Sequence, residues 1–556
     1  MQKAFYLGLC FAAQFYLGQT YEIQYTTSFE GKPTTSKNPI ITYANADKTL
    51  ILNQNILDGK AKYPFEFTEI QRKDNTVAQY AYLSADQLIE TKDNTTLAKQ
   101  EFKLTDETKK ILNHTVRKAV TSIRSNTMEV WFTQDLKVKG GPTVLGQDLG
   151  LVLEVVRNGN FVTRASSIKK VKEAKGNFLL KDKNIQEKDA LTYQDMIWKS
   201  RFTQIPVFQN EQINFTDHPK SSDGILRFAN GTIILKKVKF PEITKGQNVF
   251  VELKEQSNGD AYDRTGSVFI IPQDREISFF DGLQSGSDKL PIYDNGNGEK
   301  YKGISLTPNY LPALELMRFF TPFGISHFNK QVQLKGKDWQ TIVPYRQEIS
   351  ELTPELSGKE VWVGTYIGNY DKGGHKVSLE FTIHPGDEPI FKNNYVLPLF
   401  TTTNIMEMAG QGYPTLFNSD KGLQVEFTLE KDLKNAQLRY ITTGHGGWGN
   451  GDEFQPRKNS IFLDGKQAFS YTPWRTDCGT YRLFNPSSGN FSTGLSSSDL
   501  SRSTWCPGTL TAPIFIDLGD LKAGKHSIEV KIPQGKPEGN SISFWNVSGT
   551  LLGEIK

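Results

Sequence analysis

The sequence predicts a mainly β protein built from antiparallel sandwiches. Short runs that alternate apolar with polar residues occur along most of the chain, and Gly, Pro, Asn and Asp separate them at short intervals. Strand-like runs of this kind occupy residues 21–25, 249–254, 268–271, 361–366, 379–383, 423–429 and 526–532. Only two windows, residues 86–99 and 186–199, have moderately helical patterns. This spacing favours stacked antiparallel sheets over alternating strand and helix units.

The first twenty residues have the layout of a secretory signal. Lys3 precedes an apolar stretch over residues 4–17, and we expect cleavage between residues 18 and 20. The alternatives are a buried first strand and a lipid-modified Cys10. Elsewhere no stretch approaches the roughly 18 to 20 apolar residues that cross a bilayer, so we expect a secreted or periplasmic protein without membrane insertion.

Three folded regions are predicted after the signal, because 556 residues exceed what one hydrophobic core usually serves. A polar patch, NEQINFTDHPKSSDG, ends at Gly224, where strand patterning resumes, and Pro and Gly interrupt the pattern again at HPGDEP. The expected regions are residues 1–20 as signal, 21–205 as a β-rich domain, 206–387 as a first sandwich and 388–556 as a second.

Charge and cysteine content restrict the partners and the compartment. Lys and Arg number 65 and Asp and Glu 61, which gives a net charge of +4 without any long basic run. Neither nucleic acid nor anionic lipid is therefore an expected partner. Removal of the signal leaves Cys478 and Cys506, an even number in an exported chain, which favours a disulfide over two free buried thiols.

Several common catalytic motifs are absent from the sequence. It contains no HExxH, no paired CxxC and no GxSxG, so we expect neither a metal nor a cofactor, and no serine-hydrolase site. GDLKAGK has the spacing of a phosphate loop, but His526 follows it where Ser or Thr is required, which indicates a turn. YDNGNGEK lacks the alternating oxygen ligands of a calcium loop and is better interpreted as a flexible loop.

Two acidic loop clusters remain as candidate sites. SNGDAYDR, residues 257–264, lies directly between two predicted strands. TGHGGWGNGDEF, residues 443–454, is rich in glycine, which lets a bulky ligand approach the backbone. Taken alone, each cluster is better interpreted as an ordinary Asp turn or a solvated loop.

Four segments in a fixed order resemble the bacterial peptide-N-glycosidase F family. AYDR stands before VFII, then follow RFFTPF, ELSGKEVWV and finally WCPG before APIFIDL, and the resemblance covers about residues 225–556. It implies two adjacent eight-stranded antiparallel jelly-roll sandwiches, here preceded by the β-rich N-terminal domain. It also implies hydrolysis of the amide bond between an Asn side chain and the first GlcNAc of an N-glycan. Residues 130–156 resemble a widespread β-rich bacterial family whose function the resemblance does not supply.

The resemblance assigns roles to individual residues. It implies that Asp263 and Glu453 are catalytic, and that the disulfide of the WCPG loop joins Cys478 to Cys506. Two carboxylates suit this chemistry, because an amide needs water activated on one side and a proton delivered to nitrogen on the other. Expected substrate contacts are Tyr262, Arg264, His445, Trp448, Asp452 and Trp505, although Arg264 could instead pair with Asp260. The family's third acidic residue falls near Tyr366 or Ile367, with Asp371 the nearest carboxylate.

The expected protein is a monomer that acts on N-linked glycoproteins and glycopeptides. One alternative is a glycan-binding or adhesive protein that uses the same sandwiches without turnover. Another is an endo-glycosidase that cuts between sugars with Asp263 and Glu453 as its acid pair.

Overall fold

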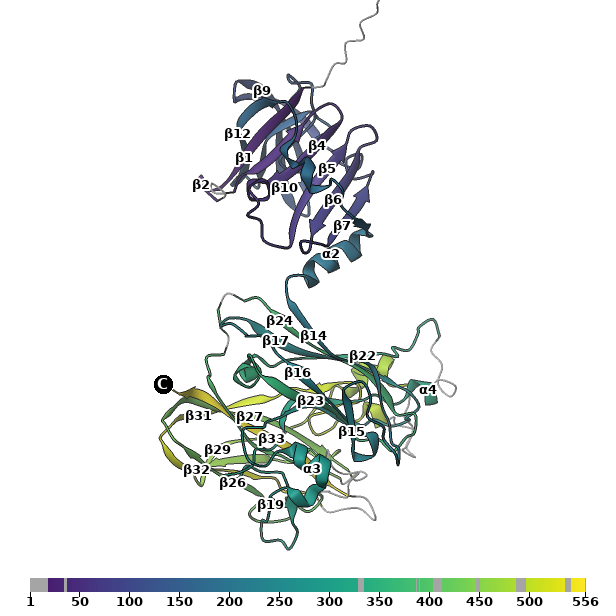
Figure 1. The fold of residues 1–556 in the computed structure, drawn as a ribbon, viewed down its shortest axis with the longest axis vertical. Coiled ribbons are helices and arrows are strands. Elements are labelled where there is room, and N and C mark those ends of the chain that lie inside the picture. Colours follow the sequence, from purple (N-terminus) through teal and green to yellow (C-terminus); the bar gives the residue numbers. More distant parts are fainter. Residues whose placement is uncertain are drawn as a thin grey trace, which may run out of the picture. The chain divides into compact units, whose positions relative to one another are not determined.

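The chain divides into two compact units, Met1–Phe202 and Thr203–Lys556 (Figure 1). The computed structural model describes residues 19–34, 38–328, 335–386, 388–389, 391–403, 413–446, 451–486, 497–535 and 542–555, so nearly all of the expected signal lies outside it. Antiparallel sheets make up both units, which confirms the predicted mainly β class. Within the described residues no helix is long and apolar enough to cross a bilayer. The boundary between the units falls after Phe202, and the sequence had predicted a boundary after residue 205.

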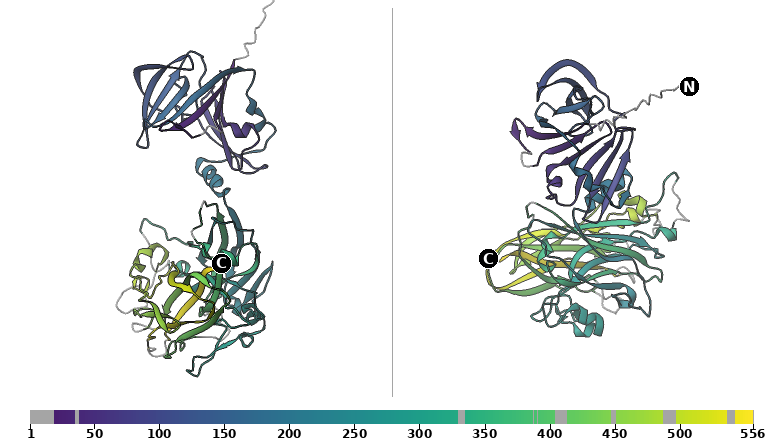
Figure 2. Two further views of the ribbon diagram at one scale, coloured as in Figure 1. Left: turned by 90° about the vertical axis from the view of Figure 1, so that its left-hand side faces the viewer. Right: turned by 45° about the horizontal axis from the view of Figure 1, so that its top comes forward.

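One strongly curved sheet of thirteen strands forms the first unit (Figure 2, left). Its order is β13-β7-β6-β5-β4-β3-β1-β12-β11-β10-β9-β8, with β2 paired to β1, and only β13 joins its neighbour in parallel. The strands are β1 (Thr20–Phe29), β2 (Lys32–Pro33), β3 (Ile40–Ala44), β4 (Lys48–Asn53), β5 (Phe65–Gln71), β6 (Thr76–Tyr82), β7 (Leu88–Asp93), β8 (Lys103–Ile111), β9 (His114–Ile123), β10 (Asn126–Thr133), β11 (Leu151–Arg157), β12 (Phe161–Val171) and β13 (Ile185–Glu187). The helices are α1 (Gln54–Leu57), the 3₁₀ helix η1 (Lys175–Leu179) and α2 (Ala190–Lys199).

Of the two segments that the sequence predicted to be helical, both in this unit, only one forms a helix. The second is largely confirmed by α2, whose first turn is capped by the Asp189 carboxylate accepting from the backbone N–H groups of Leu191 and Thr192. The first prediction, residues 86–99, is wrong, because this segment forms β7 and a following turn. Pairing with β6 and β13 buries Leu88 and Ile89, and this tertiary contact outweighs a weak local preference.

Two sheets of the second unit pack face to face as a first sandwich. Their strand orders are β14-β24-β17-β22 and β15-β16-β23-β18-β21-β30. Inward side chains such as Val251, Val363 and Phe381 share one apolar core. The strands are β14 (Thr203–Ile213), β15 (Ile225–Phe228), β16 (Ile233–Lys239), β17 (Asn248–Ser257), β18 (Thr265–Ile271), β21 (Leu314–Phe320), β22 (Val343–Glu348), β23 (Glu360–Ile367), β24 (His375–His384) and β30 (Leu510–Thr511). Since β30 comes from the C-terminal part of the chain, that part supplies an edge strand to this sandwich.

The second sandwich has the sheet orders β25-β33-β27-β31 and β26-β32-β28-β29. Along β26 every other residue from Leu423 to Leu429 is buried and the residues between them are exposed, as the alternating sequence predicted. The strands are β25 (Tyr395–Thr401), β26 (Leu423–Leu429), β27 (Leu433–His445), β28 (Asn459–Leu463), β29 (Lys466–Tyr471), β31 (Ile514–Leu521), β32 (Gly524–Lys531) and β33 (Phe544–Ile555), with the separate pair β19 (Ile292–Tyr293) and β20 (Tyr301–Lys302). The short helices of the whole second unit are η2 (Ala229–Gly231), α3 (Phe279–Ser285), η3 (Ser287–Lys289), α4 (Ile325–Phe328), η4 (Ser350–Glu355), η6 (Cys478–Phe484) and η7 (Ser497–Asp499).

A buried polar seam joins the two sandwiches. On β21, Arg318 makes a two-pronged pair with Glu315, at 2.6 and 3.0 Å, and donates to the carbonyl of Asn546 on β33 at 2.7 Å. From the other side, Arg439 on β27 pairs with Glu351 at 2.7 Å and donates to two carbonyls of β21. A buried charge that loses its partner is strongly destabilising, so the Arg439–Glu351 pair and the bonds of both arginines to carbonyls of the other sandwich resist separation.

Candidate active site

Asp263 lies in the turn that links β17 to β18, at one end of the first sandwich. The Ser257 hydroxyl donates to the carbonyl of Asp260 within this turn at 2.8 Å. The turn is also tied to the end of β21, because the backbone N–H and carbonyl of Arg264 bond to Thr321 at 2.9 Å each. Gly324 is required nearby, since a Cβ there would lie 2.0 Å from the Asp260 carbonyl oxygen. The Asp263 side chain is 14 % exposed.

Glu453 follows β27 at the corresponding end of the second sandwich. The Ser503 backbone N–H donates to the Glu453 carbonyl at 3.0 Å, and the Ser503 hydroxyl donates to the Asp452 carbonyl at 2.6 Å. Gly444 at the end of β27 permits this packing, because a Cβ would lie 2.5 Å from the Asp452 oxygen. These contacts leave the Glu453 side chain 17 % exposed.

Arg502 brings the two carboxylates together. Its Nη1 lies 3.1 Å from Asp263 Oδ2 and also donates to Glu453 Oε1, and the Arg502 side chain is fully buried. Nη2 donates to the Ser497 carbonyl at 2.8 Å and to its hydroxyl at 2.9 Å. The guanidinium carbon lies 4.3 Å from the centre of the Trp505 ring. One cation therefore holds an acidic group from each sandwich at a common point.

Burial dominates the electrostatics of the two carboxyl groups. It raises the pKa of Asp263, while Arg502 and Arg264 act in the opposite direction. Burial likewise raises the pKa of Glu453, to about 7, with Arg502 opposing and the Asp263 charge adding to the rise. Two like charges that share one cation resist simultaneous ionisation, so this pair can hold a proton near neutral pH.

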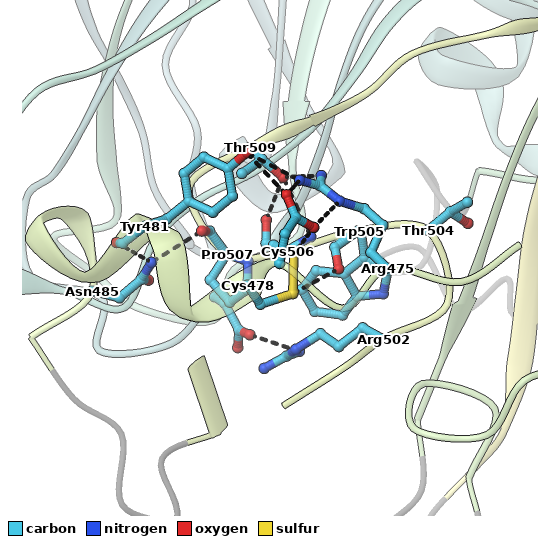
Figure 3. The surroundings of a disulfide bond; sticks show 12 residues. Arg475, Cys478, Tyr481, Asn485, Arg502, Thr504, Trp505, Cys506, Pro507 and Thr509 are labelled. Atoms are coloured by element: carbon cyan, nitrogen blue, oxygen red, sulfur yellow. Dashed lines mark hydrogen bonds and ion pairs between the residues drawn. A yellow bond between two sulfur atoms is a disulfide. The ribbon is translucent and has the colours of Figure 1, made fainter. Parts of the chain in front are cut away.

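A disulfide supports the segment that carries Arg502 (Figure 3). Cys478 and Cys506 are bonded, which confirms the predicted bridge. Arg475 lies just before the bridged loop, and its backbone forms a reciprocal pair of hydrogen bonds with the backbone of Arg502 inside the loop, at 2.8 and 3.0 Å. The Trp505 indole N–H donates to the Gly444 carbonyl at 2.9 Å, so the loop is also tied to β27.

Replacing both Cys478 and Cys506 by Ser is expected to lower the free energy of unfolding by about 3 to 4 kcal/mol. The bridge joins residues separated by 28 positions, and a cross-link of this span restricts the unfolded chain. Denaturant unfolding of the wild type and the double variant measures the loss. Exchanging both residues leaves no single thiol to form wrong pairs, and an unchanged unfolding midpoint would contradict a stabilising role for the bridge.

Tyr262 and Arg264 form an accessible face beside Asp263. Tyr262 is 48 % exposed, and the guanidinium carbon of Arg264 lies 5.3 Å from its ring centre. Arg264 also forms the pair with Asp260 that the sequence left open, with two bonds of 2.6 and 2.9 Å. Tyr370, a residue that sequence reasoning missed, is exposed and lies 5.8 Å from the same guanidinium carbon. Two exposed aromatic rings therefore flank one cation at this end of the sandwich.

The other expected sugar contacts are placed differently. Trp505 is 3 % exposed, with its ring stacked on Phe320 at 4.3 Å and near Arg502, so it supports Arg502 and does not suit contact with a sugar. His445 is buried, close to the rings of Phe320, Trp505 and Phe544, and burial lowers the pKa of its imidazole well below the usual value.

Asp452, another expected substrate contact, is fully buried and accepts hydrogen bonds from Arg457 and from the Gly535 N–H. Trp448 lies outside the described residues.

Arg502 is the second residue that sequence reasoning missed. Its only signal was its position four residues before Cys506, in a segment otherwise noted for its WCPG motif. Asp371, considered as a third acidic group, instead caps its own turn by accepting from the N–H groups of Gly373 and Gly374 at 2.7 and 2.9 Å. Among the described residues no group of three or more His, Cys, Asp or Glu side chains is arranged to hold a metal.

Comparisons with known proteins cover most of the chain. Three protein families match the chain. The family described as "Peptide-N-glycosidase F, N terminal" matches residues 204–383, and the one described as "Peptide-N-glycosidase F, C terminal" matches residues 412–552. The family described as "N-glycanase peptide, N-terminal domain" matches residues 23–195. Two solved structures described as PNGF-II, in the C2 and P21 space groups, are 66 % identical in sequence over 97 % of this chain. They superpose with TM-scores of 0.90 and 0.92 over 98 % and 100 % of their own chains. No curated protein matches the chain.

Proposed function

The chain belongs to the peptide-N-glycosidase F family, as its motifs indicated, and we propose that it is a peptide-N4-(N-acetyl-β-glucosaminyl)asparagine amidase. In this reaction water hydrolyses the amide between the Asn side chain and the first GlcNAc. The glycan leaves whole as a glycosylamine, which then loses ammonia, and Asn becomes Asp. The proposed substrates are N-linked glycoproteins and glycopeptides. We further propose export from the cell, which the mass of the mature protein from its own host would test.

The meeting of Asp263 and Glu453 on Arg502 is the observation that carries the proposal. Amide hydrolysis needs one group to activate water and another to manage the proton at the leaving nitrogen. Both carboxyl pKa values are raised by burial, so one group can keep a proton while the other accepts one. In our proposal Asp263 faces the glycosylated nitrogen and Glu453 activates water.

The exposed aromatic rings beside Asp263 suit the sugar part of the substrate. Tyr262 and Tyr370 offer flat apolar faces to sugar C–H surfaces. Between them Arg264 supplies fixed hydrogen-bond donors for sugar or amide oxygens. A glycan would therefore be held on the first sandwich, with its linkage next to both carboxylates.

One assay separates the proposed amidase from a glycosidase and from a binding protein. A glycopeptide is incubated with the protein in ¹⁸O water, and the peptide product is weighed. An amidase gives a sugar-free peptide in which Asn has become labelled Asp. A peptide that keeps one sugar would identify a glycosidase, and an unchanged glycopeptide would identify a binding protein.

We expect kcat/KM to rise as the pH increases through about 7. This is the pKa of Glu453 in the free protein, where burial is the largest influence. A carboxyl group that activates water must be ionised, so the protonated form below this pH is inactive. Because kcat/KM reports the ionisation of the free enzyme, initial rates at low glycopeptide concentration from about pH 5 to 8 measure it. A flat profile over this range would contradict the role given to Glu453.

A further inference from the structure

A buried histidine lies beneath the turn that carries Asp263. Val249, Val251 and Leu253 form the inward row of β17, and Glu255 continues this row as a fully buried carboxylate. On the adjacent strand β24 the inward row begins with His375, which is also fully buried. The apolar core of the first sandwich therefore ends, at its active-site end, in two charged residue types on neighbouring strands.

Both ring nitrogens of His375 face carboxylate oxygens. Nδ1 lies 2.8 Å from Glu255 Oε1, and Nε2 lies 3.3 Å from Asp260 Oδ2. An ionised carboxylate can only accept a hydrogen bond, so both nitrogens must carry hydrogens to satisfy both contacts. This requires the imidazolium form. Among the described residues Glu255 Oε2 has no hydrogen-bond partner, so His375 is the principal support of that carboxylate.

His375 and Arg264 act on the same carboxylate oxygen. Arg264 Nε donates to Asp260 Oδ2 at 2.6 Å, the oxygen that also faces His375 Nε2. The two cations and the two carboxylates, Glu255 and Asp260, sum to zero charge only while His375 is protonated. Loss of that proton would leave one net negative charge in a dry site, which is unfavourable.

We propose that His375 is a positioning residue: as an imidazolium it holds Asp260 in place, and Asp260 in turn holds Arg264 and its flanking tyrosines in the geometry that binds the glycan. This inference rests on the proposed function, because it assumes that Arg264 contacts the substrate. It predicts that His375 controls glycan binding more than the chemical step. The chemical step depends on Asp263 and Glu453, which His375 does not contact.

The expected pH dependence follows from the groups around the imidazole. Burial lowers the pKa of His375, but hydrogen bonds to Asp260 and Glu255 outweigh it and raise the pKa to about 9. Besides these groups and Arg264, the neighbouring elements present Tyr345 of β22, close to Glu255, and Asp371 of the turn before β24. The KM for a glycopeptide should therefore be constant at neutral pH and increase as the pH rises through about 9.

Two variants test this, each measured as kcat and KM from about pH 7 to 10. His375→Gln keeps polarity but cannot donate as a cation, and we expect KM to increase about tenfold at neutral pH while kcat changes little. The alkaline increase in KM should disappear. Glu255→Gln retains His375 but removes a charge that raises its pKa, so the alkaline increase should move to lower pH. His384→Gln, the same exchange at the far end of β24, is the matched control and should behave as the wild type.

Each outcome decides the inference. Wild-type KM profiles in both variants would overturn it, and so would a loss confined to kcat. If His375→Gln does not fold, the shift of the alkaline increase in KM to lower pH in Glu255→Gln still tests the inference. If the wild type has no amidase turnover, the proposed function fails separately, and calorimetric affinity for the same glycopeptide replaces KM in all comparisons. Equal affinity of the wild type and Glu255→Gln at every pH would then overturn the role of His375.

Discussion

Asp263→Asn and Glu453→Gln are each expected to lower turnover by about 10² to 10⁴-fold, the usual contribution of a positioned acid or base. Each amide keeps the shape of the carboxyl group but can neither deliver nor accept the required proton. The fold should survive, because each exchange removes one of two like charges that share Arg502. Turnover measured as labelled Asp in ¹⁸O water, with thermal unfolding of the same samples, checks both parts.

Asp432→Asn is a matched control for these two exchanges. Asp432 lies at the surface, where it pairs with Lys522 at 2.8 Å. Its loss should leave turnover unchanged, because surface ion pairs contribute little and this one lies outside the proposed site. Wild-type turnover by both Asp263→Asn and Glu453→Gln would remove the basis for the proposed site.

Combining Asp263→Asn with Glu453→Gln tests whether the two groups act as a unit. If water activation and proton delivery belong to one step, the double variant should lose about as much activity as the worse single variant. A fully multiplicative loss would instead indicate two independent contributions. The second outcome would favour separate roles in binding and chemistry.

The sequence predicted the strands better than it predicted the accessibility of side chains. Alternation such as that of β26 depends on the two faces of one strand, so it can be recognised locally. The segment that forms β7 was predicted wrongly because its conformation depends on pairing with the preceding strand β6 and with β13, which is distant in the chain. The local sequence pattern therefore predicts a strand where the two faces of that strand differ in polarity. It fails where pairing with other strands determines the conformation.

The same limit applies to the candidate site. Both acidic clusters could be identified, since polar turns between strands are visible in the sequence. The burial of Trp505 could not be predicted, because a Trp that stacks on Phe320 has the same sequence signal as one that faces a sugar. Arg502 was missed for a related reason: its partners come from loops about 240 and 50 residues away, Asp263 and Glu453.

Arg502→Gln is expected to destabilise the protein by about 3 to 5 kcal/mol at neutral pH and to remove most turnover. The exchange leaves Asp263 and Glu453 close together without their shared cation, in a site where burial already disfavours their charges. Arg502→Lys restores one positive charge but loses the second donor group and the flat contact with Trp505, so it should recover only part of the activity. Denaturant unfolding and the ¹⁸O assay on both variants measure the two effects.

The sign of the pH dependence distinguishes this account from a simple packing defect. Arg502 lowers the pKa of both carboxyl groups, so its loss should raise both values further above the roughly 4 of an unfolded chain. A folded state that binds the extra proton more tightly loses stability as the pH rises. The destabilisation in Arg502→Gln should therefore be small near pH 4 and grow toward neutral pH, and the acidic limb of kcat/KM should move above about 7. A loss of stability that does not change with pH would instead mean that Arg502 acts through packing on Trp505 alone.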